Sequence, residues 1–341
     1  MRVVLLHNEV GPDASLADRD LLVQLEAIAG SLRQLGHQIG HVICTLNLER
    51  ARDEVLAFRP DVVFNLVESV GGSDWLVFVA AAMLDTLGVP YTGSPTTGIF
   101  LSADKLIAKQ RLDAAGLPTP AWRTGDLGMR TCRRPRPPAA GAAARWIIKS
   151  ATQHASFGID HDSVIPDGPP EQILQRIAGQ ESLLGCPCFA EEYIEGREFN
   201  VGVVAGPGGT QCLPVAEIHF IDFPDHLPKI VGYRAKWDED AFEYDHTVRR
   251  FEIPEQDQPL AAELSRLACQ AWDLFGLEGY ARVDFRVDRE NRPWILELNA
   301  NPCLSPDAGF AVGMERIGFD YTAMVRRLLD AALGWKAGVG T

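Results

Sequence analysis

The chain has no surplus of basic residues, and this lack limits the kinds of partner that it can bind. Its 341 residues include 32 Lys and Arg against 46 Asp and Glu, a formal net charge of −14 at pH 7. Binding to nucleic acid or to an anionic membrane depends on clustered positive charge. The composition therefore argues against both partners, and a polyanionic ligand would need a local cationic pocket.

Long hydrophobic runs and patterned cysteines are missing as well. The opening MRVVLLHNEVG has an apolar stretch too short for a signal peptide or a membrane span, so we expect a cytoplasmic protein. The cysteines lack CxxC and Cys/His spacing, which favours reduced, small hydrophobic residues over disulfides or a metal site. They are Cys44, Cys132, Cys186, Cys188, Cys212, Cys269 and Cys303.

Enough apolar mass is present for two or three subdomains that share a cleft, since 46% of the residues are hydrophobic. Apolar segments at 2–6, 41–46 and 61–67 alternate with helical periodicity at 21–35, 49–58 and 75–87. This order predicts a parallel sheet covered by helices.

Ligands of such sheets bind beyond the carboxyl ends of the strands, which makes Glu68 a candidate substrate residue. The alternative is a solvated loop acid.

The second half of the chain has a mixed α+β order. Residues 125–145 are rich in Pro, Ala and Arg and predict a surface loop, after which apolar strands at 146–149, 188–194, 197–204 and 212–218 mix with helices. The helices are expected near 170–178, 259–275 and 320–333. We therefore expect an N-terminal parallel α/β domain at 1–92, a central subdomain at 93–195 and a C-terminal subdomain at 196–341.

Residues 279–302 predict an antiparallel hairpin that turns at Glu290-Asn291. In that register Asp284 faces Glu297, and Arg282 faces Asn299. The other face is apolar and should pair Val283, Phe285 and Val287 with Leu298, Leu296 and Trp294.

The polar face of this hairpin suggests a metal site. Directly opposed carboxylates about 5 Å apart repel each other unless a cation lies between them. Hard oxygen ligands suit Mg²⁺, so we assign Asp284, Glu297 and Asn299 to Mg²⁺ that is bound with a nucleotide. The alternative is an ordinary charged hairpin face whose acids are neutralised by Arg282.

Together with four upstream segments, the hairpin resembles the ATP-grasp superfamily and, within it, the D-alanine–D-alanine ligases. The similar segments are residues 87–120 with Tyr-Thr-Gly and Asp-Lys, residues 146–160, residues 190–201, and Lys236-Trp237. They occur in the family's order and cover almost the whole chain. The resemblance implies an ATP-grasp fold behind an N-terminal α/β domain, ATP and two Mg²⁺ ions as cofactors, and a homodimer.

The resemblance also implies a role for each matching residue. Lys105 and Lys149 would contact phosphates, with Ser156 as a donor on a loop that closes over them. Glu191 would reach the adenine amino group, the backbone of Tyr193 and Ile194 the ring edge, and Glu198 the ribose. Lys236 and Trp237 would close over nucleotide and second substrate, and Arg282 would stabilise the tetrahedral oxyanion. Lys149, Lys236 and Arg282 are thus the catalytic candidates.

The substrate half departs from the family. An early glutamate, a loop serine and a loop tyrosine of the family match Arg19 or Asp20, Ala155 and Trp237, so the family's link between serine and tyrosine cannot form. The product-carboxylate cradle reads Asn-Pro-Cys-Leu-Ser-Pro-Asp-Ala at 301–308, which makes Ser305 and Asp307 substrate candidates. Asp307 would favour an ammonium or guanidinium group.

These observations predict an ATP-dependent ligase that forms an amide bond through an acylphosphate. Its small-molecule substrates would be amino acids or peptides that are bulkier than D-alanine or carry a positive group. Two alternatives stay open: a genuine D-alanine–D-alanine ligase of peptidoglycan synthesis, and a nucleotide-binding protein that has lost turnover.

Overall fold

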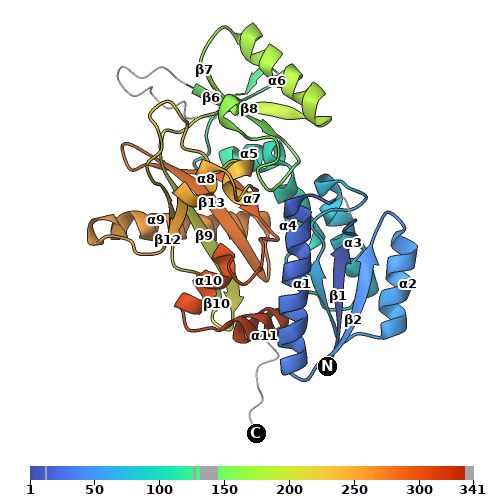
Figure 1. The fold of residues 1–341 in the computed structure, drawn as a ribbon. Coiled ribbons are helices and arrows are strands. Elements are labelled where there is room, and N and C mark those ends of the chain that lie inside the picture. The colour runs from blue at the N-terminus through green and yellow to red at the C-terminus, as the bar shows by residue number, and fades with distance from the viewer. Residues whose placement is uncertain (12–13, 126–127, 131–144, 335–341) are drawn as a thin grey trace.

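The computed structural model describes residues 1–11, 14–125, 128–130 and 145–334 (Figure 1). Most of the predicted surface loop at 125–145 lies outside these residues, so that interpretation stays a prediction. Within the described ranges, no helix has the length and apolar character needed to cross a membrane.

The N-terminal part is a parallel sheet of order β2-β1-β3, as predicted. Its strands are β1 (Arg2–Asn8), β2 (Gln38–Cys44) and β3 (Val62–Leu66), and its helices are α1 (Leu16–Gln34), α2 (Leu48–Phe58) and α3 (Val77–Leu87). Alternate residues of β1 face opposite sides. Val3 and Leu5 pack with α1, while Val4 and Leu6 pack with α2 and α3. The sheet is therefore covered on both faces, which explains its continuous apolar strands.

The central part is an antiparallel sheet of order β5-β4-β8-β6-β7. It comprises β4 (Trp122–Thr124), β5 (Gly128–Arg130), β6 (Arg145–Ser150), β7 (Val164–Pro166) and β8 (Cys188–Glu192). Helix α6 (Pro170–Leu184) packs on it through Ile173 and Ile177, and it lies at the top in Figure 1. This helix is longer than the predicted segment and ends at Gly185, whose positive φ of 68° suits a helix end.

The C-terminal part contains the largest sheet, of order β12-β11-β9-β13-β14, with β10 beside β9. The strands are β9 (Gly196–Gly206), β10 (Gly209–Cys212), β11 (Ala216–Phe220), β12 (Thr247–Arg250), β13 (Tyr280–Asp288) and β14 (Pro293–Asn299). Helices α4 (Thr96–Ala103), α5 (Lys105–Ala114) and α9 (Gln258–Phe275) cover its apolar face. Short helices α7 (Tyr233–Trp237) and α8 (Phe242–His246) lie between β11 and β12, and α10 (Gly309–Arg316) and α11 (Tyr321–Ala332) end the described chain.

The hairpin of β13 and β14 has the predicted register at its functional end. Arg282 pairs with Asn299, and Asp284 pairs with Glu297. A β-bulge after Asp284 then shifts the pairing by one residue, so Phe285 meets Ile295 and Val287 meets Pro293. The predicted pairs of Phe285 with Leu296 and Val287 with Trp294 are therefore wrong. The extra residue, Leu296, lines the cavity described below, because a bulge re-aims the side chains around it.

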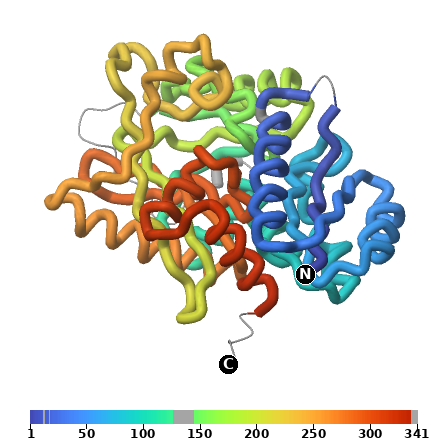
Figure 2. The backbone as a smooth tube through the Cα atoms, turned by 60° about the horizontal axis from the view of Figure 1, so that its bottom comes forward, coloured from blue at the N-terminus to red at the C-terminus, as the bar shows by residue number. Residues whose placement is uncertain are grey.

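The parts of the chain are tied together by helices that pack across them. Figure 2 shows α11 alongside α1, and Thr322 Oγ1 donates to Gln34 Oε1 at 3.0 Å. Helices α4 and α5, from the predicted central subdomain, pack on the C-terminal sheet instead. The three sheets fall within the three predicted segments, but the boundaries at 92 and 195 stay a prediction.

Candidate active site

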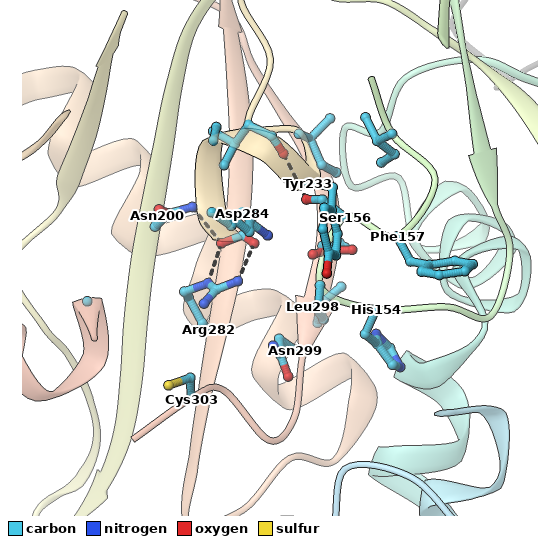
Figure 3. A pocket seen from close by; sticks show the side chains of 18 of the residues that line it. His154, Ser156, Phe157, Asn200, Tyr233, Arg282, Asp284, Leu298, Asn299 and Cys303 are labelled. Atoms are coloured by element: carbon cyan, nitrogen blue, oxygen red, sulfur yellow. Dashed lines mark hydrogen bonds and ion pairs between the residues drawn. The ribbon is translucent and has the colours of Figure 1, made fainter. Parts of the chain in front are cut away.

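A cavity of about 820 Å³ lies between the three parts and is lined by residues from each of them (Figure 3). Every residue that the sequence assigned to catalysis, nucleotide, metal or substrate lies in its wall, with Arg19, one of two alternatives for a single family position, left outside: Glu68, Lys105, Lys149, Ser156, Glu191, Tyr193, Ile194, Glu198, Lys236, Trp237, Arg282, Asp284, Glu297, Asn299, Ser305 and Asp307. The fold thus brings these residues together, while the role of each one stays a prediction.

A buried carboxylate fixes the lysine of β6. Lys149 Nζ and Lys109 Nζ both bond to Glu191 of β8, the latter at 2.6 Å. Burial opposes the charge of Glu191, but the two ammonium groups outweigh it and lower its pKa. Glu191 therefore positions Lys149 at the cavity wall. Its predicted contact with adenine is untested.

Lys109 is a residue that sequence reasoning missed. It is fully buried on α5 and also donates to Thr119 Oγ1 at 2.8 Å. A signal was available, since Lys109 follows Lys105 by four residues and so shares its face of the helix.

Positive charge gathers around Glu297. Lys105 Nζ lies 3.6 Å from Glu297 Oε2 and donates to the carbonyl of Gln153 at 2.7 Å. Burial opposes the charge of Glu297, yet Lys105, Lys236 and their cationic neighbours lower its pKa to about 2. The carboxylate is thus ionised at any physiological pH.

Arg282 and Asp284 form a two-bond ion pair on β13. Arg282 Nε and Nη2 donate to the two oxygens of Asp284 at 2.7 and 2.9 Å, and Asn200 Nδ2 adds a bond at 2.7 Å (Figure 3). This is the neutralising contact that the sequence left open as an alternative. Arg282 keeps Nη1 for another partner, so its predicted oxyanion role is still compatible with the geometry.

The predicted Mg²⁺ ligands offer two carboxylates and one amide oxygen, a donor set that fits Mg²⁺ chemically. A carboxylate has about four lone-pair sites, so Asp284 has acceptor capacity beyond its bonds to Arg282 and Asn200. Across the described ranges, however, no three His, Cys, Asp or Glu side chains form a ready metal cluster. The metal assignment of Asp284, Glu297 and Asn299 therefore stays a prediction.

The segment between β6 and β7 is held in a strained turn over the cavity. Ala155 and Ser156 both have positive φ, at 55° and 62°. The Ser156 hydroxyl donates to the carbonyl of Val231 at 2.8 Å, so its proton is used within the protein rather than kept for a phosphate. Trp237 Nε1 donates to the carbonyl of Ala155 at 3.3 Å. The family's hydroxyl link between positions 155 and 237 cannot form, as expected, and a hydrogen bond from indole to backbone that the sequence did not predict joins the two positions instead.

The opposite end of the cavity is acidic and is built on α1. Asp20 accepts from Ser305 Oγ at 2.8 Å and from Cys303 Sγ at 2.9 Å. Gln24 Nε2 donates to Glu68 at 3.0 Å and to Asp20 at 3.3 Å. Of the two positions considered from sequence, Asp20 lines the cavity, whereas Arg19 is exposed outside its wall.

Sequence reasoning missed Gln24 and treated Cys303 as a packing residue, although both bond to the acidic end. Asp18 and Asp74 line the same region, so four carboxyl groups face this end. Four acids favour a bound cation such as a substrate ammonium group.

The ionised form of Glu68 is disfavoured at this acidic end. Burial, together with Asp20, Asp74 and Asp18 and despite the bond from Gln24, raises the pKa of Glu68 to about 7. A carboxyl group whose folded pKa is raised stabilises the fold below its unfolded pKa, and that stability is lost as pH rises through 7.

We therefore expect Glu68→Gln to be more stable than the wild type at pH 8, by on the order of 1 to 3 kcal/mol, and nearly equal to it at pH 4.5. Urea unfolding at both pH values measures this. Equal stability of the two proteins at pH 8 would show that Glu68 ionises normally.

Asp307 has an arginine beside it. It is exposed, and its backbone carbonyl accepts from Arg249 Nη1 at 3.1 Å. Arg249 also lines the cavity and was missed from sequence, because only the fold brings β12 beside residues 301–308. The prediction that position 307 favours a cationic group was based on Asp307 alone and did not include the nearby guanidinium of Arg249.

Known proteins share both the sequence pattern and the fold. The family model described as D-ala D-ala ligase C-terminus matches residues 146–330. D-alanine–D-alanine ligases of Synechococcus sp. (strain JA-2-3B'a(2-13)) and Moorella thermoacetica are 30% and 32% identical, each over 90% of this chain. These matches cover 87% and 92% of the relatives' own lengths. An uncharacterized protein of Sinorhizobium fredii is 27% identical over 90% of this chain and 86% of its own length.

The crystal structure of D-alanine–D-alanine ligase from Bacillus anthracis has a TM-score of 0.71 at 19% identity and covers 100% of both chains. The same enzyme complexed with ATP has a TM-score of 0.68 at 18% identity, again over 100% of both chains. The predicted ATP-grasp fold is thus confirmed, and a role as an inactive nucleotide-binding protein is disfavoured. The chain belongs to the D-alanine–D-alanine ligase family of ATP-dependent ligases that form a carbon–nitrogen bond.

Proposed function

We propose that this chain joins the carboxylate of one amino acid to the amine of a second, at the expense of ATP. The observation that carries the proposal is the polarity of the cavity. Asp20 and Glu68 mark an acidic end suited to an ammonium group, while Lys105, Lys149 and Arg282 supply positive charge for phosphates and carboxylates. A zwitterionic amino acid beside a nucleoside triphosphate would place its ammonium group at the acidic end, and its carboxylate and the phosphates near the cationic residues.

The chemistry follows from these positions. A substrate carboxylate oxygen attacks the γ-phosphorus of ATP, which forms an acylphosphate and releases ADP. The amine of the second substrate attacks the acyl carbon, loses a proton, and expels phosphate with the original carboxylate oxygen. Lys105 and Lys149 orient the phosphates, and Arg282 stabilises the oxyanion that develops on the acyl group. Mg²⁺, if held by Asp284, Glu297 and Asn299, would neutralise phosphate charge.

D-alanine is the substrate that the relatives favour, since the ligases that match most of this chain carry that name. The comparisons thus support the alternative that the sequence left open more than they support a different substrate. A second candidate, a ligase for another amino acid or peptide, has one specific observation in its favour. By the resemblance, Ala155, Trp237 and residues 301–308 depart from the family's pattern at the substrate end, and in the structure Asp20 accepts hydrogen bonds from Cys303 and Ser305 there.

One assay separates these candidates: ADP release with saturating D-alanine, compared with a panel of L-amino acids, basic amino acids and dipeptides. Turnover near ten per second with D-alanine, unmatched by the panel, would identify a D-alanine–D-alanine ligase. A panel member that exceeds D-alanine about a hundredfold would identify the second candidate. Absence of ADP formation with every pair would contradict the proposed activity.

A further inference from the structure

Arg249 is a cation in the cavity wall to which no step above assigns a role. It lies on β12, and its guanidinium reaches the cavity beside residues 307–309. Among the described residues, Nη1 alone has a hydrogen-bond partner, the carbonyl of Asp307 at 3.1 Å, and no carboxylate forms an ion pair with Arg249. A guanidinium has five N–H donors, so most of them are available to a ligand.

The space for this guanidinium comes from a glycine. A Cβ atom at Gly309 would lie 3.1 Å from Arg249 Nε and 3.3 Å from Cζ. Any side chain at position 309 would therefore crowd the arginine. The absence of one lets Arg249 rest against the start of α10, at the edge of the cavity.

The charge of Arg249 is poorly balanced by its surroundings. Arg249 is exposed overall, but desolvation where its guanidinium packs against Gly309, together with the nearby Arg282, lowers its pKa, and Asp307 and Cys303 offset this only in part. Surroundings that disfavour a positive charge would gain from an anion bound beside it. The other two arginines of this wall, Arg282 and Arg286, cannot serve equally. Two of the Arg282 nitrogens bond to Asp284, and Arg286 bonds to Glu198 and to two backbone carbonyls.

We propose that Arg249 binds the free carboxylate of the amine substrate and selects amino acids or peptides over amines that lack this group. The proposal rests on the proposed function and names a specificity residue for it. A planar guanidinium holds a carboxylate with two parallel bonds, which explains why an arginine suits this place. It also replaces the expectation, based on Asp307 alone, that this end of the cavity favours a cationic group.

The test compares Arg249→Gln with the wild type in ADP release, using the best amine of the panel and the same amine with its carboxylate converted to an amide. We expect KM for the free acid to rise about ten- to a hundredfold in the variant, since a charge-assisted hydrogen bond is lost. KM for ATP should stay within about twofold. The wild-type preference for the acid over the amide should disappear.

Arg250→Gln is the matched control. Arg250 is the next residue of the same strand, and it lines a separate hollow with Glu217 and Glu252. Its substitution removes the same charge from the opposite face of β12. We expect Arg250→Gln to retain both KM values and the preference for the free acid.

A binding measurement keeps the proposal independent of turnover. Calorimetry with ADP and Mg²⁺ present would titrate the product of the best substrate pair of the panel, and the C-terminal amide of that product, into the wild type and Arg249→Gln. We expect the wild type to bind the free acid at least tenfold more tightly than the amide, and the variant to bind them alike. If the variant keeps the preference, or if the wild type shows none, Arg249 does not bind this carboxylate even where ADP formation confirms the ligase.

Discussion

Replacing Lys149 by methionine is expected to lower kcat/KM for ADP formation by about a hundred- to a thousandfold, the usual cost of losing one preorganised electrostatic group. Methionine keeps the apolar stem and removes only the ammonium group that Glu191 holds at the cavity wall. The fold should survive, because Lys109 continues to neutralise Glu191. Steady-state kinetics measure the rate, and calorimetry with a non-hydrolysable ATP analogue measures the affinity.

Lys229→Met is the control for this experiment. Lys229 is exposed and does not line the cavity, so its loss removes the same charge without touching the proposed phosphate site. The control should keep wild-type kinetics. Unchanged affinity for the ATP analogue in Lys149→Met would remove Lys149 from the phosphate site.

Replacing Glu297 by glutamine is expected to reduce kcat by about a hundredfold or more and to raise the Mg²⁺ concentration needed for half-maximal rate at least tenfold. The substitution keeps the shape of the side chain and removes a charge that Asp284 faces across the hairpin. Glu290→Gln is the control, because Glu290 is exposed at the turn of the same hairpin. A Mg²⁺ dependence identical to that of the wild type would mean that Glu297 is not a ligand.

The pKa of Glu297 adds a stability readout to the same variant. A carboxylate whose folded pKa is depressed to about 2 stabilises the fold above its unfolded pKa, and this contribution is lost as pH falls through 2. Glu297→Gln should therefore be less stable than the wild type at pH 7, by on the order of 2 kcal/mol. The difference should shrink steadily as the pH is lowered below about 4.5.

The hairpin shows how far the sequence predicts this site. The strict alternation around Asp284 left one face apolar, and a one-residue slip would have buried its acids, so the register at Arg282 and Asp284 could be predicted. The bulge beyond Asp284 could not, because the backbone N–H of Ile295 bonds to the carbonyl of Pro118, far away in the sequence. Local alternation carries no information on such a partner.

The same reason explains the residues that were missed. Lys109 is a site residue because it bonds to Glu191 on a distant strand. Arg249 is one because the fold brings residues 307–309 to the end of β12. The hydrogen bond from Trp237 to the carbonyl of Ala155 could not be predicted either, because it depends on a left-handed backbone conformation that an alanine seldom adopts. Motifs thus predicted many of the residues that line the cavity, while the hydrogen-bond partners of these residues depend on long-range packing.

Isotope transfer is the most direct measurement of the central claim, the attack of a substrate carboxylate on the γ-phosphorus. The enzyme is supplied with ATP, Mg²⁺ and the best acid substrate of the panel, labelled with ¹⁸O in its carboxylate, together with the amine. Mass spectrometry of the inorganic phosphate follows the label. An acylphosphate route predicts one ¹⁸O atom in each phosphate released alongside ADP. Unlabelled phosphate, or AMP and pyrophosphate in place of ADP and phosphate, would contradict the account.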